Sequence, residues 1–483
     1  MIFRKYSIFS WVAIIVAAIC LVSCNKQDEL TPDDAASKLV QMTFSASTSD
    51  SAADAKTHVN LSESSSPNLY WNSGDAISVL PYGSNRNDSF GLTAGDGLTC
   101  ATFTGTTASA AKYYALYPYQ SGVTLDGDVV KNVDLPRRQV ATPGTFDPRC
   151  NLMVAVSNGT DFSFKQVCSY IKVTPAFPCK QITIKSNNNG NALTGKCNIS
   201  LGQDGTPSVS ITKDTAIVSL VPAEGLISAG NSYLIAVYPG TLSSGFMVSF
   251  TAEDDKVYIY KHVSEVPLVK GNILNIMGFQ GWSAIVDYVQ LWDGGPKWAT
   301  VNLGATSSTE SGDYFAWGEI EPYYNYFNSG SMLVQDGWRS DRSGYFSASY
   351  PFSYTTIWDN SGVLLACYDA ATQLWGGSWS MPTEDDFRGL LSYCSYSYDE
   401  QSQVCTFTGR QTGQSVTFPL AGFFDGGRSF TQKGNQGKYW SKSANTTNTN
   451  TNAYYLLLPG GTTSPEVSSR SRHRGYSIRP VIH

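Results

Sequence analysis

YYALYP, residues 113–118, and YLIAVYP, residues 233–239, repeat one local pattern. Each is a run of aromatic and aliphatic side chains that ends at a proline. Such a run predicts a strand buried on both faces. Proline has no amide hydrogen for a further ladder bond, so it predicts the end of each strand. Because the pattern occurs twice, the sequence predicts two sandwich units of related design rather than one long sheet.

Short alternating segments separated by Gly, Asn, Asp and Pro surround both runs, which is typical of β-sandwiches. At 483 residues the chain is longer than one hydrophobic core usually supports. Charged residues make up 15% of it, below the usual level of about 25%, while aromatic residues reach 13%. The net charge of −6 argues against a nucleic-acid partner. The expected strands are QMTFSA, AISVLPY, TCATFTG, YYALYPY, FSFKQVCSYIKVT, QITIKS, CNISLG, AIVSLVP, YLIAVYPG, GFMVSFTA and KVYIYKHV.

Several of these segments, taken in order, resemble the fimbrillin family of Bacteroides-type surface proteins. The matching motifs are WNSGDAISV, ATFTG, YYALYPY, LPRRQ and FKQVCSYIKV, followed by LTGKCNISLGQDGTP and VKGNILNIMGF. The resemblance implies two transthyretin-like β-sandwiches, at residues 40–178 and 179–281, in a pilus subunit or pilus-like lipoprotein. The alternating pattern by itself predicts four core residues: Trp71, Phe103, Tyr114 and Tyr117.

Two helices are expected near the middle of the remaining chain. The first has an apolar stripe with Gly376 as its C-terminal cap, and the second has a stripe that follows WGGSWSMPTEDD, residues 375–386. Thr383 and Asp386 are spaced as a capping box, and Glu384 and Asp385 lie in the first turn, where the helix dipole stabilises carboxylates. We therefore interpret these acids as a helix start rather than a catalytic cluster. The stripes are Cys367, Ala370, Ala371 and Leu374, then Phe387, Leu390, Leu391 and Cys394.

Six ordered motifs in the last part of the chain resemble the Fibrobacter succinogenes major paralogous domain, which is related to the C-type-lectin-like and formylglycine-generating-enzyme-like fold. They are VNLGA, GDYFAWGE, DAATQLWGGSWSMPT, FPLAGFF, GKYWS and RGYSIRPVI. The resemblance implies that residues 283–483 form an α+β domain whose first and last strands pair. The expected fold class is thus mainly β, with two transthyretin-like β-sandwich units followed by a C-type-lectin-like domain with two helices.

This chain lacks the residues that carry the activities of the related families. No cysteine follows Cys405, so formylglycine-type chemistry has no reactive pair. Calcium-dependent sugar binding needs six to eight oxygens, but Glu321-Pro322-Tyr323 lacks a ligand and Lys442 stands where an acid is needed. We expect no enzyme activity, no cofactor and no metal. Crowded aromatic residues are the candidate ligand-binding residues: Tyr323, Tyr324, Tyr326, Phe327, Tyr345 and Tyr350. Four tryptophans (Trp317, Trp375, Trp379 and Trp440) are expected in the core instead.

A lipoprotein signal peptide is expected at residues 1–23. Arg4 and Lys5 precede a short apolar run, and Leu21 to Cys24 resembles a lipobox, which makes Cys24 the lipidation site. Residues 24–39 are polar and acidic and read as a flexible tether. We therefore expect a lipid-anchored protein of the outer membrane that is exposed at the cell surface.

Two further features leave alternatives open. Cys394 and Cys405 could bridge a hairpin as a disulfide or remain two buried thiols. Arg470, Arg472, His473 and Arg474 form a basic patch, which could meet anionic glycans or headgroups or could be an exposed loop before the last strand. The leading functional interpretation is adhesion, as an accessory or tip fimbrillin-like subunit with a lectin-like head. Its partners would be other pilus subunits and a host or bacterial surface glycan or protein. The alternative is a glycan-capturing lipoprotein of a polysaccharide-uptake system.

Overall fold

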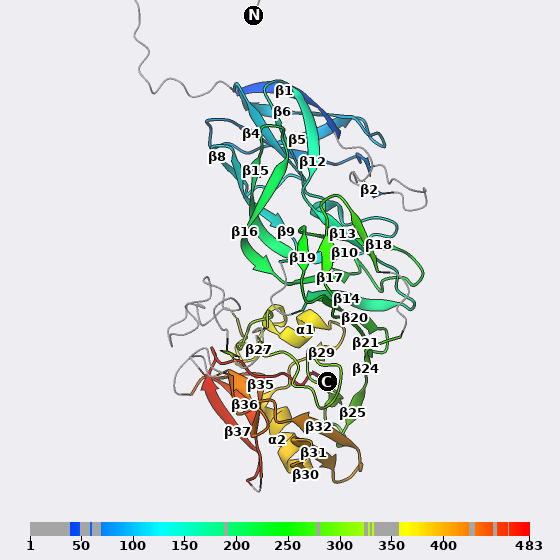
Figure 1. Ribbon diagram of the computed structural model, residues 1–483, viewed down its shortest axis with the longest axis vertical. Coiled ribbons are helices and arrows are strands. Elements are labelled where there is room, and N and C mark those ends of the chain that lie inside the picture. The colour runs from blue at the N-terminus through cyan, green and yellow to red at the C-terminus, as the bar shows by residue number, and fades with distance from the viewer. Residues whose placement is uncertain are drawn as a thin grey trace, which may run out of the picture. The chain divides into compact units, whose positions relative to one another are not determined.

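A computed structural model describes residues 39–48, 58–59, 69–187, 192–276, 281–322, 327–328, 331–332, 357–424, 430–447, 452–461 and 463–483. Within these ranges the protein is mainly β, with two α-helices, α1 (Ala370–Leu374) and α2 (Glu384–Tyr393) (Figure 1). The predicted mainly β class with two helices is confirmed. Short 3-10 turns occur at Pro148–Cys150 and Ala366–Tyr368.

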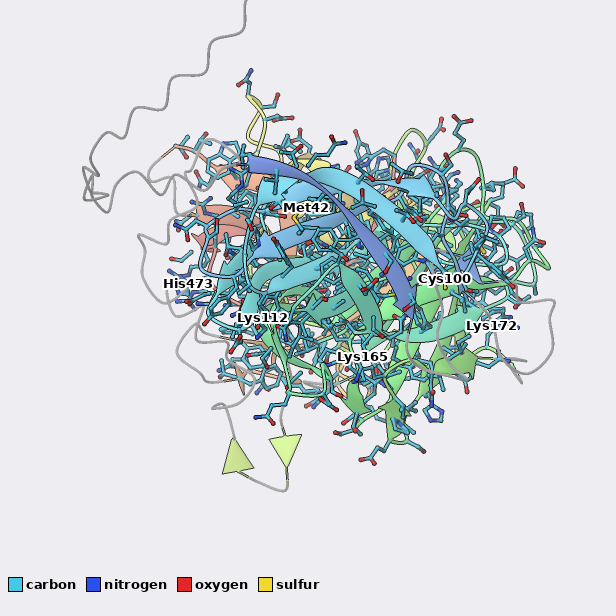
Figure 2. The ribbon with its side chains drawn as sticks, turned by 90° about the horizontal axis from the view of Figure 1, so that it is seen from above. Met42, Cys100, Lys112, Lys165, Lys172 and His473 are labelled. Carbon is cyan, nitrogen blue, oxygen red and sulfur yellow. The ribbon has the colours of Figure 1, made fainter. Side chains whose placement is uncertain are left out.

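The first body is a closed barrel of hydrogen-bonded strands. It closes because β1, which carries Met42 in Figure 2, pairs in parallel with β12 on one side and antiparallel with β6 on the other. The predicted core residues Trp71, Phe103, Tyr114 and Tyr117 are all buried. In ring order the strands are β1 (Leu39–Thr48), β12 (Asp161–Gln166), β11 (Met153–Ser157), β7 (Tyr113–Tyr117), β4 (Ala76–Pro81), β5 (Asp88–Ala94) and β6 (Ala101–Ala108). A short pair, β2 (His58–Val59) and β3 (Leu69–Tyr70), also precedes β4.

The second body is built from several sheets around a separate core. Its largest sheet has six strands: β10 (Arg138–Val140), β17 (Ile217–Val221), β14 (Cys179–Ser186), β20 (Phe246–Ala252), β21 (Val257–His262) and β24 (Ala284–Val286). A three-stranded sheet comprises β18 (Tyr233–Val237), β13 (Ser169–Val173) and β23 (Ile273–Ile276). The others are β16 (Pro207–Thr215), β15 (Thr194–Leu201), β9 (Val129–Leu135) and β8 (Thr124–Asp126), and the pair β19 (Gly240–Leu242) and β22 (Val266–Leu268).

The two repeated runs are strands buried on both faces, as predicted. Every residue of β7 and of β18 is buried. Side chains of β18 alternate between two cores: Leu234 and Ala236 face the core shared with the barrel, whereas Ile235 and Val237 face the core beneath the six-stranded sheet. Continuous apolar runs are therefore required, because neither face of these strands meets water.

Strand pairing crosses the boundary predicted between residues 178 and 179. β9 pairs with β15, β10 pairs with β17, and β13 pairs with β18 and β23. FSFKQVCSYIKVT, expected as one strand, is two strands in different bodies, with β12 in the barrel and β13 in the second body. The chain leaves the barrel after β7 and returns to it for β11, so the first two bodies are interleaved.

The C-terminal region (residues 287–483) contains both helices and several small antiparallel sheets. Its first and last strands belong to one sheet but do not pair directly as predicted, because β26, the second strand, lies between β25 and β38. That sheet is β25 (Tyr288–Gln290), β26 (Lys297–Ala299), β38 (Val481–Ile482) and β29 (Trp379–Ser380). The others are β30 (Cys394–Asp399), β31 (Val404–Gly409) and β32 (Ser415–Pro419); β35 (Gln436–Asn445), β36 (Asn452–Pro459) and β37 (Glu466–Ser471); β33 (Phe423–Phe424) and β34 (Phe430–Thr431); and β27 (Phe327–Asn328) and β28 (Ser331–Met332).

Helix α1 is shorter than its apolar stripe predicted. Asp369 is its N-cap and accepts the backbone N–H of Thr372 at 3.0 Å, so Cys367 lies before the helix and is exposed. Gly376 follows the helix with a φ of +69°, the left-handed conformation expected of a glycine at this position. The predicted C-terminal cap is confirmed, and the inclusion of Cys367 in the stripe was wrong.

The C-terminal region covers the outer face of the six-stranded sheet. Met247, Val257 and Ile259 project from β20 and β21 into the same buried cluster as Trp317, Trp375 and Trp379 of the C-terminal region. The opposite face of β20 contributes Val248 and Phe250 to the second body's own core. All seven residues of β20 are therefore buried, although only one face lies within the sandwich.

The turn after α1 contributes several polar contacts to this interface; α1 and β29, which flank the turn, are labelled in Figure 1. Thr251 donates to the carbonyl of Trp375, and the backbone N–H of Ser378 donates to Asp255 at 2.9 Å. The Trp379 indole donates to the carbonyl of Asp255 at 2.7 Å. A Cβ on Gly377, whose φ is +58°, would lie 2.3 Å from the Asp255 carboxylate. Glycine is required here because the backbone approaches the sandwich too closely for a side chain.

Ile259→Ala tests whether the six-stranded sheet and the C-terminal region unfold together. Ile259 is fully buried in the shared cluster, so the substitution is expected to reduce the free energy of unfolding by about 2–5 kcal/mol. The urea concentration at the midpoint of unfolding should decrease by the same amount whether unfolding is followed by circular dichroism or by tryptophan fluorescence. The matched control, Ile211→Ala at a position 37% exposed on β16, should change stability by less than about 0.5 kcal/mol. A shift in only one signal would contradict the shared core.

Candidate functional site

The acidic triplet at residues 384–386 begins α2, as predicted. Thr383 Oγ1 accepts the backbone N–H of Asp386 at 3.1 Å, and the Asp386 carboxylate accepts the backbone N–H of Thr383 at 2.7 Å. The predicted capping box is thereby confirmed. Glu384 pairs with Arg388 one turn later, and Asp386 also contacts His483 Nε2 at 2.9 Å. Both acids thus have local structural partners.

The four tryptophans considered as sugar-stacking platforms are core residues, as expected. Trp317, Trp375, Trp379 and Trp440 are each at most 3% exposed. The indoles of Trp317 and Trp440 donate to the backbone carbonyls of Ser441 and Phe315, at 2.7 and 2.9 Å. Buried and hydrogen-bonded, these rings have no free face for a ligand.

The predicted aromatic ligand-binding residues are not placed by the structure. Tyr323, Tyr324, Tyr326, Tyr345 and Tyr350 lie outside the described residues, as does the lipidation site Cys24. Phe327 belongs to β27, which pairs with β28, but only its backbone is described. These assignments remain predictions.

The disulfide considered between Cys394 and Cys405 does not form. Both are buried free thiols on neighbouring strands. In the register of β30 and β31, Cys394 lies opposite Gly409, and Cys405 lies opposite Tyr398. The two cysteines are thus offset by four residues along the strands, roughly 13 Å, whereas a disulfide needs Cα atoms within about 7 Å. The alternative of two buried thiols is the one observed.

The basic patch spans the end of β37 and the turn that follows it. Arg470 is exposed on the strand, so it does not lie in a loop, while Arg472, His473 and Arg474 are partly buried in the turn. The Arg472 guanidinium lies 4.9 Å from the Trp358 ring centroid and 5.4 Å from that of Trp317. His473, labelled in Figure 2, is half-buried, and burial lowers its pKa, which favours the neutral imidazole. Charge in the patch therefore comes mainly from arginine.

A buried lysine lies next to this patch. We call Lys438, Phe423, Tyr455, Tyr476 and Arg470 the Lys438 cluster. Lys438 on β35 is 8% exposed, and its ammonium lies 3.5 Å from the centroid of the Phe423 ring. The rings of Tyr455 and Tyr476 are centred 5.6 and 5.5 Å from the same nitrogen. In the part of the chain that the structure describes, the ammonium forms no ion pair or hydrogen bond.

Like charges and burial shape the electrostatics of the Lys438 cluster. Burial, followed by repulsion from Arg470, lowers the pKa of Lys438 to about 8. Burial and the neighbouring Tyr455 raise the pKa of the Tyr476 phenol, an effect that Arg474 and Arg470 oppose. The Tyr476 hydroxyl is buried and makes no hydrogen bond of normal geometry. The cluster therefore combines cations with a buried hydroxyl, and among the residues described no acid contributes to the pKa shift of Lys438.

Sequence reasoning overlooked Lys438, although one signal was present. GKYWS, residues 437–441, reads as a buried strand, and a lysine at its second position contradicts that environment. The neighbours of Lys438 come from residues far apart in sequence, Phe423, Tyr455 and Tyr476, and only the folded sheet brings them together.

Known proteins show little similarity to this chain. No model of a known protein family matches the chain, and none of the curated proteins does. A solved structure that it resembles is the crystal structure, at 2.18 Å resolution, of a "putative cell adhesion protein" from Bacteroides ovatus ATCC 8483. The two are 14% identical with a TM-score of 0.31, and the match covers 52% of this chain and 95% of the other.

The described ranges contain neither a metal-ion cluster nor a membrane-spanning helix. No group of three or more His, Cys, Asp or Glu side chains there is arranged to hold a metal ion. Glu321, considered at sequence level as a calcium ligand, is 5% exposed and accepts the backbone N–H of Ala216 in the second body at 3.4 Å. No helix of the described chain is long and apolar enough to cross a bilayer.

Substitution of the cap residues tests the structural role of the acidic triplet. Thr383→Ala is expected to reduce the free energy of unfolding by about 0.5–2 kcal/mol, because the N-cap hydrogen bond is lost. Asp385→Asn, at an exposed position in the same turn, is the control. It should reduce the free energy of unfolding by no more than about 1 kcal/mol.

The same helix start should respond to acid. Burial opposes ionisation of Asp386, but hydrogen bonds from His483 and Thr383 outweigh it and hold the pKa of that carboxyl below its usual range. Its contribution is therefore complete above the unfolded pKa of about 3.9 and is lost as pH falls through the lower folded value. Between pH 5 and pH 2, the free energy of unfolding should decrease more steeply for the wild type than for Asp386→Asn. Parallel curves would contradict this assignment.

Proposed function

We propose that the chain is a surface lipoprotein of the outer membrane that acts in adhesion, with the C-terminal region as its binding head. In a fimbrillin-like assembly it would be an accessory or tip subunit. The observation that carries this proposal is the Lys438 cluster with the adjoining basic patch, which gathers cations on one region of a chain whose net charge is −6. Local charge of opposite sign to the whole protein favours contact with an anionic partner.

The attachment of the head to the sandwich supports a load-bearing role. β24 adds to the edge of the six-stranded sheet beside β21, and β25 of the C-terminal region begins two residues later. Arg137 of the second body donates to Gln373 at 2.7 Å, and Lys185 pairs with Asp313. A head fixed by a shared core and several polar contacts passes force to its support without a flexible joint, which adhesion requires.

The protonation state of the buried cysteines supports a binding function rather than catalysis by a cysteine thiolate. Burial raises the pKa of every buried cysteine in the described residues, reaching about 11 for Cys394 and for Cys405. The reactive form of cysteine is the thiolate, so these side chains are protonated and inert at neutral pH.

Metabolic labelling tests the anchor. Cells that express the full chain with radiolabelled palmitate should incorporate label into the protein, because Cys24 is the expected acylation site. Cys24→Ser retains the size of the side chain but removes the thiol, so it should abolish labelling and release the protein from the membrane fraction. Unchanged labelling of the variant would contradict the assignment.

Attachment under flow tests the adhesive role. Cells displaying the wild type should adhere to glycan-coated and matrix-coated surfaces, whereas cells making only Cys24→Ser should adhere at background level, because binding without an anchor cannot hold a cell. If the purified chain binds glycans but anchored cells do not adhere, the alternative of glycan capture for uptake is favoured. Absence of both binding and adhesion would contradict both functions.

A further inference from the structure

Within the described ranges, the Lys438 ammonium has neither the opposite charge nor the hydrogen bonds that a buried charge normally requires. Moving an ammonium out of water costs several kcal/mol unless an opposite charge or hydrogen bonds compensate. Its described neighbours supply the faces of Phe423, Tyr455 and Tyr476, and a cation over an aromatic ring gains only about 0.5–2 kcal/mol. Arg470 is the described charge that acts on it, and Arg470 repels it. Among the residues that the structure describes, no anion is paired with this ammonium.

The neighbours of the ammonium are arranged as partners for such an anion. The Tyr476 ring stacks on Trp440, with centroids 4.2 Å apart, so its buried hydroxyl is held in place beside the Arg474 guanidinium. Arg470 comes from β37, two strands from Lys438 in the same sheet, and its charge acts on both Lys438 and Tyr476. Ammonium, guanidinium and phenol are all donors that favour carboxylate and sulfate oxygens.

We propose that the Lys438 cluster binds a carboxylate or sulfate group carried on a saccharide, with Lys438 and the Tyr476 hydroxyl at the inner end of the site and Arg470 at its exposed side. This inference rests on the proposed function, because the saccharide is the surface ligand of the adhesive head. The rings of Phe423, Tyr455 and Tyr476 are at most 7% exposed, so they cannot stack on a sugar. Recognition thus depends on the charged group and not on a flat sugar face.

The charge state of Lys438 gives the site a characteristic pH response. The facing groups are Arg470 on β37, Tyr455 on β36, and Arg474 and Tyr476 in the C-terminal segment. Arginine keeps its charge throughout the neutral and mildly alkaline range, and burial raises the pKa of Tyr476. Because burial lowers the pKa of Lys438 to about 8, its ammonium is lost first as pH rises. Affinity for an anion should therefore decline between pH 7 and 9.5.

Lys438→Met in the full chain tests the proposal. Methionine retains an unbranched apolar stem and removes the charge, and Lys433→Met is the matched control because Lys433 is exposed in the neighbouring hairpin and carries the same charge. Binding to polygalacturonate, dextran sulfate, neutral dextran and polyglutamate is measured by surface plasmon resonance in detergent at pH 7. The wild type should bind one or both anionic saccharides, with dextran at background level.

The expected result is a loss of affinity of roughly tenfold or more for Lys438→Met, as for removal of a charged hydrogen-bond donor, and less than about twofold for Lys433→Met. The melting temperature of Lys438→Met should be equal to or above that of the wild type, because an uncompensated buried charge has been removed. Wild-type affinity should fall between pH 7 and 9.5, and Lys438→Met should show no such fall.

Three outcomes would overturn the proposal. The first is undiminished binding by Lys438→Met, and the second is equal binding to neutral dextran. The third is tighter binding of polyglutamate than of either anionic saccharide, which would identify an acidic peptide as the ligand. If anchored cells adhere under flow while Lys438→Met binds normally, adhesion stands and only the assignment of the ligand fails.

Discussion

The six-stranded sheet of the second body must be covered on both faces, and this requirement organises the rest of the molecule. One face of β20 lies on the core of its own body, and the other presents Met247 to the C-terminal region. An apolar sheet face left in water would favour association with other molecules. The turn after α1 meets this face with backbone groups and tryptophan rings, and Gly377 permits the close approach. The C-terminal region is therefore a structural layer of the protein and not an appendage.

That layer constrains where a ligand can bind. The face of β35 and β36 that carries Trp440 and Tyr455 belongs to the cluster shared with the second body, while the opposite face, with Tyr439 and Leu456, packs on α2. Lys438 lies on the first of these faces but near its edge, where Arg470 reaches solvent. The surrounding rings fix the position of the ammonium, and preorganisation of this kind reduces the entropy that the proposed anion binding would cost.

Local signals in the sequence predicted local structure well. The Thr383–Asp386 spacing, the glycine cap at Gly376 and the apolar runs ended by proline depend on neighbouring residues only, and each has the expected conformation. Pairing between distant strands was less predictable, since alternation shows that a segment is a strand but not which strand it joins. The boundary at residue 178 and the Cys394–Cys405 bridge both depended on such long-range choices. Lys438 was overlooked for the same reason, because its surroundings exist only after three strands meet.

The interleaving of the barrel with the second body has a consequence for how the chain acquires its structure. β11 and β12 complete the barrel only after the chain has passed through β9 and β10, whose partners lie much later in the sequence. Arg138 of β10, for example, pairs with Ser219 of β17. Such topology has a high contact order. The chain loses conformational entropy when its large loops close, before the strand pairs that offset this cost have formed. Slow assembly is therefore expected, and unpaired strand edges stay exposed meanwhile, so folding should benefit from a chaperone that shields those edges.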